Sequence, residues 1–509
     1  MMSVFHEFVN SPVFRKGLSS SWVGCCACST KATTIKAPKS QQWHESPGAA
    51  KVQGQPTAHT HPHLLQNGEV MPGIRLEEFQ ERRHRFMSKI QKYALKHDYS
   101  EKQLVVIPSA TKVYMTEKIP YVFRQNSDFL YLSGCMEPDS ALILTGEGDS
   151  FKSTLFLRKN DSHSELWDGP RTDMDEAPSM FGVDQALPVG ELPSYLFSFA
   201  RSHRSFLLWY DYMQAIQPDI HKVLREFLTE TWSKKWESPR PFIQQLRLYK
   251  SPAEVALMQA TCKIGSDAIS STISSAHEGI TEHQLFARVD YECRMRGAEY
   301  LAYPPVVAGG ERANIIHYIN NNQVVHRGDM VLMDAGCEYH GYCSDITRTW
   351  PISGSFTSTQ KALYEAVLSV QKDLINLCSA FPTLDSLFNS MCKLLGKRLK
   401  ELGMLSMHIS ENELSKAAYS FCPHHVSHYL GMDVHDTALI PRSINLEPGM
   451  VITVEPGIYV NPKNKLAAPE FRGMGVRIED DVLLTASGPV VLTEGCPKEV
   501  ADLENLCQS

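Results

Sequence analysis

The first half of the chain combines one long helical pattern with several short apolar runs. From Ile74 onward, apolar residues three and four apart in the stretch 76–94 predict an amphipathic helix. Strands mixed with helical segments indicate an α/β domain. Runs rich in Val, Ile, Leu and Phe predict these β-strands at 103–108, 128–134, 140–146, 153–158 and 205–211.

The start of a second domain is marked by a helix-capping pattern. Ser251 is a suitable N-cap, Pro252 suits the first helical position, and Glu254 completes a capping box. The same pattern returns at Thr281, ahead of a second helical segment. We therefore expect the domain boundary near residues 245–250.

Two aspartates stand inside the strand-like stretch MVLMDAGCEYHGYCSDITRTW (330–350). With Tyr339 and His340 as a two-residue loop, Asp334 and Asp345 would face each other across a hairpin. Opposed like charges destabilise a strand pair by up to roughly 1 kcal/mol, whereas a cation between them makes the pairing favourable. A surface hairpin with solvated aspartates, or a bulge that separates them, is the alternative from this stretch alone.

Three later segments contain further polar residues in strand-like or helical settings. Glu455 closes an apolar strand directly before a Pro-Gly pair, and Arg477 and Glu479 share one face of a strand-like run. A charged Glu in such a strand needs a partner, either Arg477 or a metal ion. His424 and His428 are four apart and suit one helical turn. Taken singly, each residue also has an ordinary structural explanation.

Taken together, these segments predict a metal site with four carboxylates and one imidazole. Oxygen-dominated ligand sets suit hard or borderline ions such as Mn²⁺ rather than structural zinc. Four negative charges balance two divalent cations, which indicates a two-metal centre. The candidate ligands are Asp334, Asp345, His428, Glu455 and Glu479.

The order and context of the segments DAG, SDITRTW, HHVSHYLGMDVHD, TVEPGIY and GVRIEDD resemble the dinuclear metallopeptidases of the pita-bread fold. Within that family the chain is most similar to aminopeptidase P (Xaa-Pro aminopeptidase) and to its mitochondrial form, over roughly residues 70–509. The resemblance implies a creatinase-like α/β N-terminal domain followed by an α+β pita-bread metallopeptidase domain. It also implies a homodimer that releases the N-terminal residue from Xaa-Pro peptides. Prolidase, which cuts Xaa-Pro dipeptides, and a non-catalytic pita-bread binding or scaffold protein are the alternatives.

The resemblance implies a role for each candidate residue. Asp345 and Glu479 would bridge two ions, Asp334 would bind one of them, and His428 and Glu455 the other. A water acidified by both cations would be the nucleophile. Glu455 would also pass a proton to the leaving nitrogen.

Further residues are assigned to catalysis or substrate by the same resemblance. His435 would donate to the developing oxyanion, and Arg477 would orient a bridging carboxylate. Trp167 would approach the active site of a neighbouring subunit, although a buried aromatic is the ordinary fate of Trp. His340 receives no role and is expected to be solvated. The residues assigned to substrate are Tyr303, His317, His424, His435 and Trp167.

Composition narrows the possible partners. The 509 residues predict two to three domains, and a net charge of −7 without a basic stripe argues against nucleic acid. No apolar run approaches the ~18 residues that span a bilayer, so we expect no membrane partner.

The 13 cysteines are scattered along the chain. The C-x-x-C at 25–28 lacks a second pair, which argues against a zinc site, and Cys337 and Cys343 are expected to be free thiols.

The N-terminus differs from the rest of the chain. Up to His44 it carries five basic residues, one acid (Glu7) and many Ser and Thr, which is typical of a mitochondrial transit peptide. Glu7 interrupts the expected amphipathic start, and a cytoplasmic protein with a disordered N-terminus is the alternative. The expected organisation is a leader at 1–40, an extended arm at 41–73, an N-terminal domain at 74–246 and a catalytic domain at 247–509.

Overall fold

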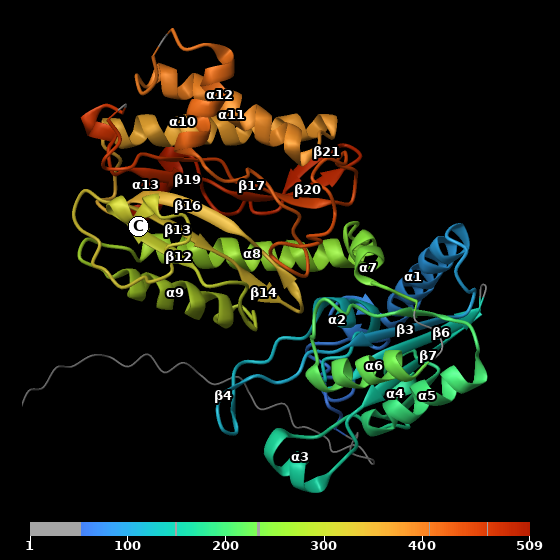
Figure 1. Ribbon diagram of the computed structural model, residues 1–509. Helices are drawn as coiled ribbons and strands as arrows, with labels where there is room; N and C mark the ends of the chain where they lie inside the picture. Colours follow the sequence, from blue (N-terminus) through green and yellow to red (C-terminus); the bar gives the residue numbers. More distant parts are fainter. Residues whose placement is uncertain (1–51, 148–149, 232–234, 407, 466, 509) are drawn as a thin grey trace, which may run out of the picture. The chain divides into compact units, whose positions relative to one another are not determined.

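The computed structural model describes residues 52–147, 150–231, 235–406, 408–465 and 467–508 (Figure 1). The expected leader, its C-x-x-C motif and the first part of the arm lie outside the described residues. The later part of the arm contacts the first domain, because Gln55 Nε2 donates to Gly134 O at 3.1 Å and Met136 N donates to Gln55 Oε1 at 2.7 Å.

The first domain is built on a six-stranded mixed sheet in the order β10-β9-β3-β6-β7-β8. Strands β3, β6 and β7 are antiparallel neighbours, whereas β8, β9 and β10 join the sheet as parallel neighbours. The expected α/β class is confirmed. The strands are β3 (Gln103–Pro108), β6 (Ala141–Glu147), β7 (Ser150–Leu157), β8 (Gln185–Pro188), β9 (Leu207–Trp209) and β10 (Trp236–Glu237).

Helices cover both faces of this sheet, so its strands read as continuous apolar runs rather than alternating ones. In β3, Leu104 and Val106 pack with residues of α5 and α6, while Val105 and Ile107 pack with residues of α1 and α7. The helices are α1 (Leu76–Lys96), α2 (Ser127–Ser133), α3 (Ser162–Asp168), α4 (Ala177–Phe181), α5 (Leu192–Ser202), α6 (Pro218–Glu230) and α7 (Arg240–Arg247). Two hairpins, β1 (Glu69–Met71) with β2 (Ile74–Arg75) and β4 (Tyr114–Thr116) with β5 (Ile119–Pro120), complete the domain.

One of the predicted strands is wrong. The segment at 128–134 forms α2, whereas the other four predicted strands are present as β3, β6, β7 and β9. Asn126 caps α2 by accepting from Phe129 N at 3.0 Å, and Gly134 ends it with a left-handed φ of 68°. Because the whole helix is buried, its apolar run carries no period that separates helix from strand.

The second domain consists of small antiparallel sheets with helices packed against them, as expected for an α+β domain. The sheets are β12-β13-β16, β17-β20-β21, β11-β14-β15 and β18-β19. Helix α8 contacts β14, β15 and β16, and α10 contacts β17, β18 and β19. The predicted capping boxes at Ser251 and Thr281 are both present, at the starts of α8 and α9.

The helices of the second domain are α8 (Pro252–Ser274), α9 (Glu282–Met295), α10 (Ser358–Leu377), α11 (Leu384–Glu401), α12 (Glu411–Phe421) and α13 (Val500–Cys507). Its strands are β11 (Tyr300–Leu301), β12 (Val306–Gly309), β13 (Met330–Ala335), β14 (Cys337–Tyr339), β15 (Tyr342–Cys343), β16 (Ile346–Pro351), β17 (Val451–Val454), β18 (Gly457–Tyr459), β19 (Gly475–Arg477), β20 (Asp480–Thr485) and β21 (Gly488–Val491).

The hairpin at 330–350 has a different register from the predicted one. Its loop is His340-Gly341, with φ of 49° and 78°, and Asp334 pairs with Thr347 instead of Asp345. Positive φ at both central residues favours Gly at the second position, which places the turn one residue later than predicted. The two aspartates therefore do not face each other in the ladder, and Asp345 stands just before β16.

His340 is also not solvated. Its Nδ1 lies 2.8 Å from Glu299 Oε1, and only 11% of its side chain is exposed. The expectation for the cysteines is confirmed, since Cys337 and Cys343 are both buried free thiols. Among the helices that the structure describes, none combines the length and apolar character of a bilayer-spanning segment.

Candidate metal centre and substrate cavity

A cavity of about 1240 Å³ lies in the second domain, with Arg124 of the first domain at its wall. Its lining residues come from segments more than 170 positions apart in the chain, so only the fold brings them together. Ten of the eleven residues predicted for the site line this cavity: Tyr303, His317, Asp334, Asp345, His424, His428, His435, Glu455, Arg477 and Glu479.

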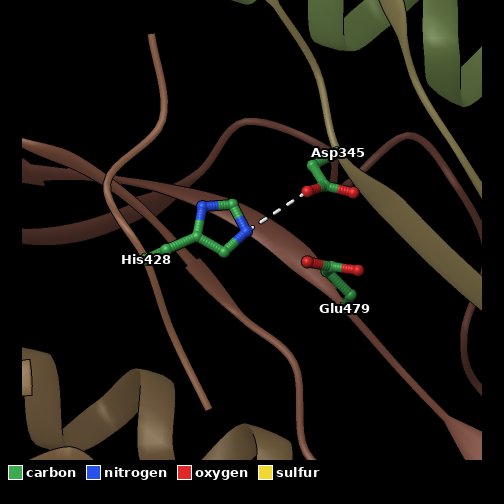
Figure 2. Close-up of side chains that lie close together, drawn as sticks. All are labelled: Asp345, His428 and Glu479. Atoms are coloured by element: carbon green, nitrogen blue, oxygen red, sulfur yellow. Dashed lines mark ion pairs between the residues drawn. The ribbon is translucent and has the colours of Figure 1, made fainter. Parts of the chain in front are cut away.

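Three of the predicted ligands form the centre of the cavity. One donor atom from each of Asp345, His428 and Glu479 lies within 4.8 Å of the others (Figure 2). His428 Nε2 is 3.3 Å from Asp345 Oδ2. Asp345 precedes β16 and Glu479 precedes β20, so both carboxylates stand where a strand begins.

His428 lies on an extended segment beside β17, not on the predicted helical turn. Tyr429 pairs with Ile452, and Thr453 N donates to His428 O at 3.0 Å. Backbone pairing with a strand therefore replaces the i, i+4 helical bonds that the His424–His428 spacing suggested. His428 Nδ1 lies 3.1 Å from Tyr429 O. If Nδ1 carries the proton, Nε2 offers its lone pair to the carboxylate side of the cavity, as a metal ligand requires.

Glu455 and Asp334 extend the centre on its two sides. Glu455 directly follows β17, and its Oε1 lies 3.7 Å from His428 Nε2. Asp334 lies within β13. The hydroxyl of Tyr303 lies 2.6 Å from Asp334 Oδ1 and 2.5 Å from Asp345 Oδ1, and so links the two carboxylates that the hairpin register separates.

Arg477 connects the carboxylates to the histidine side of the cavity. Its Nη2 donates to Asp334 Oδ2 at 2.6 Å, and its Nη1 donates to Tyr459 OH at 2.7 Å. Tyr459 OH in turn lies 2.9 Å from His424 Nε2. Arg477 also reaches Glu479 indirectly, because its Nε donates to Thr347 Oγ1 at 3.2 Å and Thr347 Oγ1 donates to Glu479 Oε2 at 2.6 Å.

The electrostatics of the centre fit a cation. Burial, then the charges of Asp345, Glu455 and Asp334, raise the pKa of Glu479 well above its usual range. Burial is also the first cause that raises the pKa of Asp345, and it raises the pKa of Glu455 to about 7. Buried carboxylates with raised pKa values hold protons. A divalent cation displaces these protons when it binds, because its charge stabilises the ionised carboxylates. The donor set, rich in oxygen with one imidazole, suits such an ion.

Two histidines at the cavity wall are neutral at physiological pH. Burial, then the positive charge of Arg477, lowers the pKa of His424 to about 4. Burial, then the charge of His428, lowers the pKa of His435 to about 4 as well. The rings of His435 and His428 lie edge to face with centroids 4.5 Å apart. A neutral imidazole in this position can donate an N–H hydrogen bond to a substrate oxygen.

Comparison with known proteins agrees with this geometry. The chain matches "Metallopeptidase family M24" over residues 256–486 and "Aminopeptidase P, N-terminal domain" over residues 79–209. Xaa-Pro aminopeptidase 3 of Homo sapiens is 45% identical over 97% of this chain and 96% of its own length. The chain belongs to the Xaa-Pro aminopeptidases of metallopeptidase family M24. "Intermediate cleaving peptidase 55, mitochondrial" of Arabidopsis thaliana is 38% identical over 89% of this chain and 87% of its own length.

Solved structures of M24 peptidases share the fold of both domains. "Proline aminopeptidase P II from Yersinia pestis" is 33% identical, with a TM-score of 0.79 over 86% of this chain and 100% of its own. "Zn substituted E. coli Aminopeptidase P in complex with product" is 32% identical, with a TM-score of 0.78 over 86% of this chain and 98% of its own. The α/β plus pita-bread architecture is therefore shared over nearly the whole described chain.

Trp167 is the predicted site residue that this M24 peptidase does not bring to the cavity. It lies on α3 with 77% of its surface exposed, so it is not the buried aromatic that is the ordinary fate of Trp. Residues that sequence reasoning missed include Tyr459, Thr347 and Arg442, which link or line the site. Tyr459 and Thr347 carried a signal, since they stand in the TVEPGIY and SDITRTW segments that were already singled out.

Proposed function

We propose that this M24 metallopeptidase removes the N-terminal residue from peptides with proline in the second position. It is a metal-dependent exopeptidase, and relatives named for this activity match it over almost its full length. The observation that carries the proposal is the convergence of all five candidate ligands on one cavity. A non-catalytic binding protein of this fold is expected to have lost metal ligands. None of the five candidate ligands is substituted in this chain.

For the metal centre we propose two divalent ions, and we propose that these are Mn²⁺. Asp345 and Glu479 would hold both ions, Asp334 would hold one of them, and His428 and Glu455 would hold the other. Bound ions of this kind acidify a water and polarise the scissile carbonyl. The proposal is supported by the donor geometry and by the raised pKa values of Asp345, Glu455 and Glu479.

The roles of the remaining residues follow from their positions. We propose that His435 donates its N–H to the oxygen of the scissile carbonyl and that Glu455 carries a proton to the leaving nitrogen. Arg477 orients Asp334, and through Thr347 it also orients Glu479. The residues that contact the substrate are Tyr303, His317 and His424 together with His435.

The substrate class follows from the chemistry of proline and from the size of the cavity. An Xaa-Pro bond lacks the amide N–H on which general peptidases rely, and proline confines the backbone. The cavity, at about 1240 Å³, exceeds the roughly 300–1,000 Å³ of a small-molecule pocket. That space favours peptides longer than a dipeptide, and so favours aminopeptidase P over prolidase.

A peptide panel tests the proposed function. We expect the metal-stripped protein to be inactive, and added Mn²⁺ to restore loss of one residue from Xaa-Pro-Xaa but not from Xaa-Ala-Xaa, as measured by mass spectrometry. Zn²⁺ in a parallel sample tests the choice of metal. Cleavage confined to the Xaa-Pro dipeptide would instead show prolidase activity, and bound metal without cleavage of any peptide would favour a binding protein.

We further propose that the mature protein is a mitochondrial homodimer. Leu166 and Trp167 are 79% and 77% exposed, and Lys112, two residues before the β4–β5 hairpin, forms an ion pair of 3.0 Å with Asp168 of α3. An exposed apolar patch of this kind is typical of an interface, and a second copy of the chain would cover it. The exposed apolar residues of the hairpin and of the residues next to it are Val113, Tyr114, Met115, Ile119, Tyr121 and Val122.

Native mass spectrometry of the protein purified from its own cells tests both parts of this proposal. We expect a dimer of chains that are each lighter than the 57.2 kDa of the 509 residues by the leader. The relatives include a mitochondrial peptidase, which supports removal of the leader on import. A monomer would contradict the interface, and an intact N-terminus would favour cytoplasmic residence.

A further inference from the structure

The segment that carries His435 has little regular structure of its own. Residues 431–437, here called the His435 loop, form bends and the start of a turn between the extended His428 segment and the cavity rim. His435 itself is exposed toward the cavity, while Asp436 is buried. Thr437 has a left-handed φ of 48°, which a β-branched residue seldom adopts. Contacts from outside must therefore impose the shape of this loop.

Those contacts converge on one buried arginine. Arg247, the last residue of α7, has 3% of its side chain exposed and reaches the loop from its buried side. Its Nη2 donates to Asp433 Oδ2 at 2.7 Å and also to Asp436 Oδ1, so one guanidinium nitrogen holds carboxylates on both sides of His435. Its Nη1 donates to Asp128 Oδ1 at 2.6 Å. Asp128 belongs to α2 in the first domain.

Other groups complete the anchor around the same two aspartates. From the first domain, Arg124 Nη2 donates to Asp433 Oδ1 at 3.0 Å and to Met432 O at 2.7 Å, and Ser127 Oγ donates to Asp433 Oδ1 at 2.6 Å. From the segment between α7 and α8, Lys250 Nζ donates to Asp436 Oδ2 at 3.3 Å. The loop is thus held by cations from the first domain and from the connection between the domains.

The geometry of a guanidinium explains why an arginine occupies this place. Its planar fork can bind two carboxylates on different sides in fixed directions, whereas an ammonium is a point charge without such directions. Buried Asp128 and Asp436 also need a paired cation, because an unpaired buried carboxylate is strongly destabilising. Arg247 therefore fixes the direction of the loop and also neutralises the negative charge of its aspartates.

We propose that Arg247 is a positioning residue, which holds the His435 loop so that the imidazole points at the substrate carbonyl. Through Asp128 it makes the alignment of His435 depend on docking of the first domain. This inference rests on the proposed function, because it takes His435 to act on the substrate. It assigns the first domain a part in catalysis in addition to its own fold.

A double-mutant cycle tests the inference. In the metal-loaded enzyme, Arg247→Lys is expected to lower kcat by about 10- to 100-fold, since small misplacements of a catalytic group have effects of this size. KM and the metal content should stay close to the wild-type values. In a His435→Ala background, the same Arg247→Lys change should lower kcat by less than about threefold, because the group that it positions is absent.

Arg240→Lys is the matched control, because Arg240 lies on the same helix and approaches Asp128 and Asp211 without touching the loop. Its kcat should equal that of the wild type. If Arg247→Lys does not fold, Asp436→Asn takes its place in the same cycle. Equal losses of kcat from Arg247→Lys with and without His435 would overturn the inference, and so would a lower melting temperature at unchanged kcat. An inactive wild-type enzyme would instead refute the proposed function.

Discussion

Replacement of Asp345 or Glu479 by alanine is expected to abolish peptide hydrolysis while the protein stays folded. Both carboxylates are buried and offer an oxygen within 4.8 Å of a His428 nitrogen, and we propose that both would hold the two ions. Loss of either carboxylate would weaken the binding of both proposed ions, so metal content measured by elemental analysis should fall together with kcat. Asp267→Ala, at an exposed ion pair with Lys263, is the control and should keep wild-type activity.

The stability of these variants adds a second readout. Burial and the charges of Asp345, Glu455 and Asp334 raise the pKa of Glu479, so without metal its ionised form is disfavoured in the folded protein. Glu479→Ala removes a buried carboxyl group whose ionised form is disfavoured there, and we expect a melting temperature in chelator at or near that of the wild type. Added Mn²⁺ should stabilise the wild type by about 2.7 kcal/mol at 100 times its Kd, but not the variant. Wild-type activity in either alanine variant would refute the ligand assignment.

Local patterns were sufficient to predict those elements whose signals lie within a few residues. The capping boxes at Ser251 and Thr281 are both present, and β3 spans the predicted residues 103–108. The same reasoning failed at 128–134, because a fully buried helix and a buried strand have the same apolar composition. The caps at Asn126 and Gly134 were the local signals that separate the two.

The candidate site shows a different limit of prediction from local sequence patterns. Its five candidate ligands were found from residue type and context, although the predicted hairpin register and the predicted helical turn at His428 are both wrong. The five residues line one cavity all the same, because Tyr303 links Asp334 and Asp345 where the ladder does not. Such a contact joins segments about 30 and 40 positions apart, and no local spacing encodes it.

Local sequence patterns also could not predict the residues that hold the candidate ligands and His435 in place, because their contacts join distant segments. Arg247 contacts Asp433 and Asp436 more than 180 positions away, and its surrounding sequence reads as an ordinary amphipathic helix end. Tyr459 stood in a recognised segment, but its link between Arg477 and His424 depends on how three separate segments meet. Residue type indicates which groups can do chemistry, whereas the fold decides which groups hold them in place.

His435→Ala is expected to retain both metal ions and to lose kcat by roughly 100-fold or more, the loss that follows removal of an oxyanion donor. His435 is not among the candidate ligands, so elemental analysis should show unchanged metal, and KM should change little. His435→Gln keeps an N–H donor and should recover part of the rate. His326→Ala, at an exposed histidine outside the cavity lining, is the control and should be fully active.

The pH dependence separates hydrogen-bond donation by His435 from acid–base catalysis. Burial lowers the pKa of His435 to about 4, so its imidazole is neutral throughout the range from about pH 6 to 9. The ratio of wild-type to His435→Ala kcat should therefore be constant across that range. A ratio that changes tenfold per pH unit near neutrality would show that His435 titrates during catalysis, and would contradict the donor role. Loss of metal from His435→Ala would place this histidine among the ligands instead.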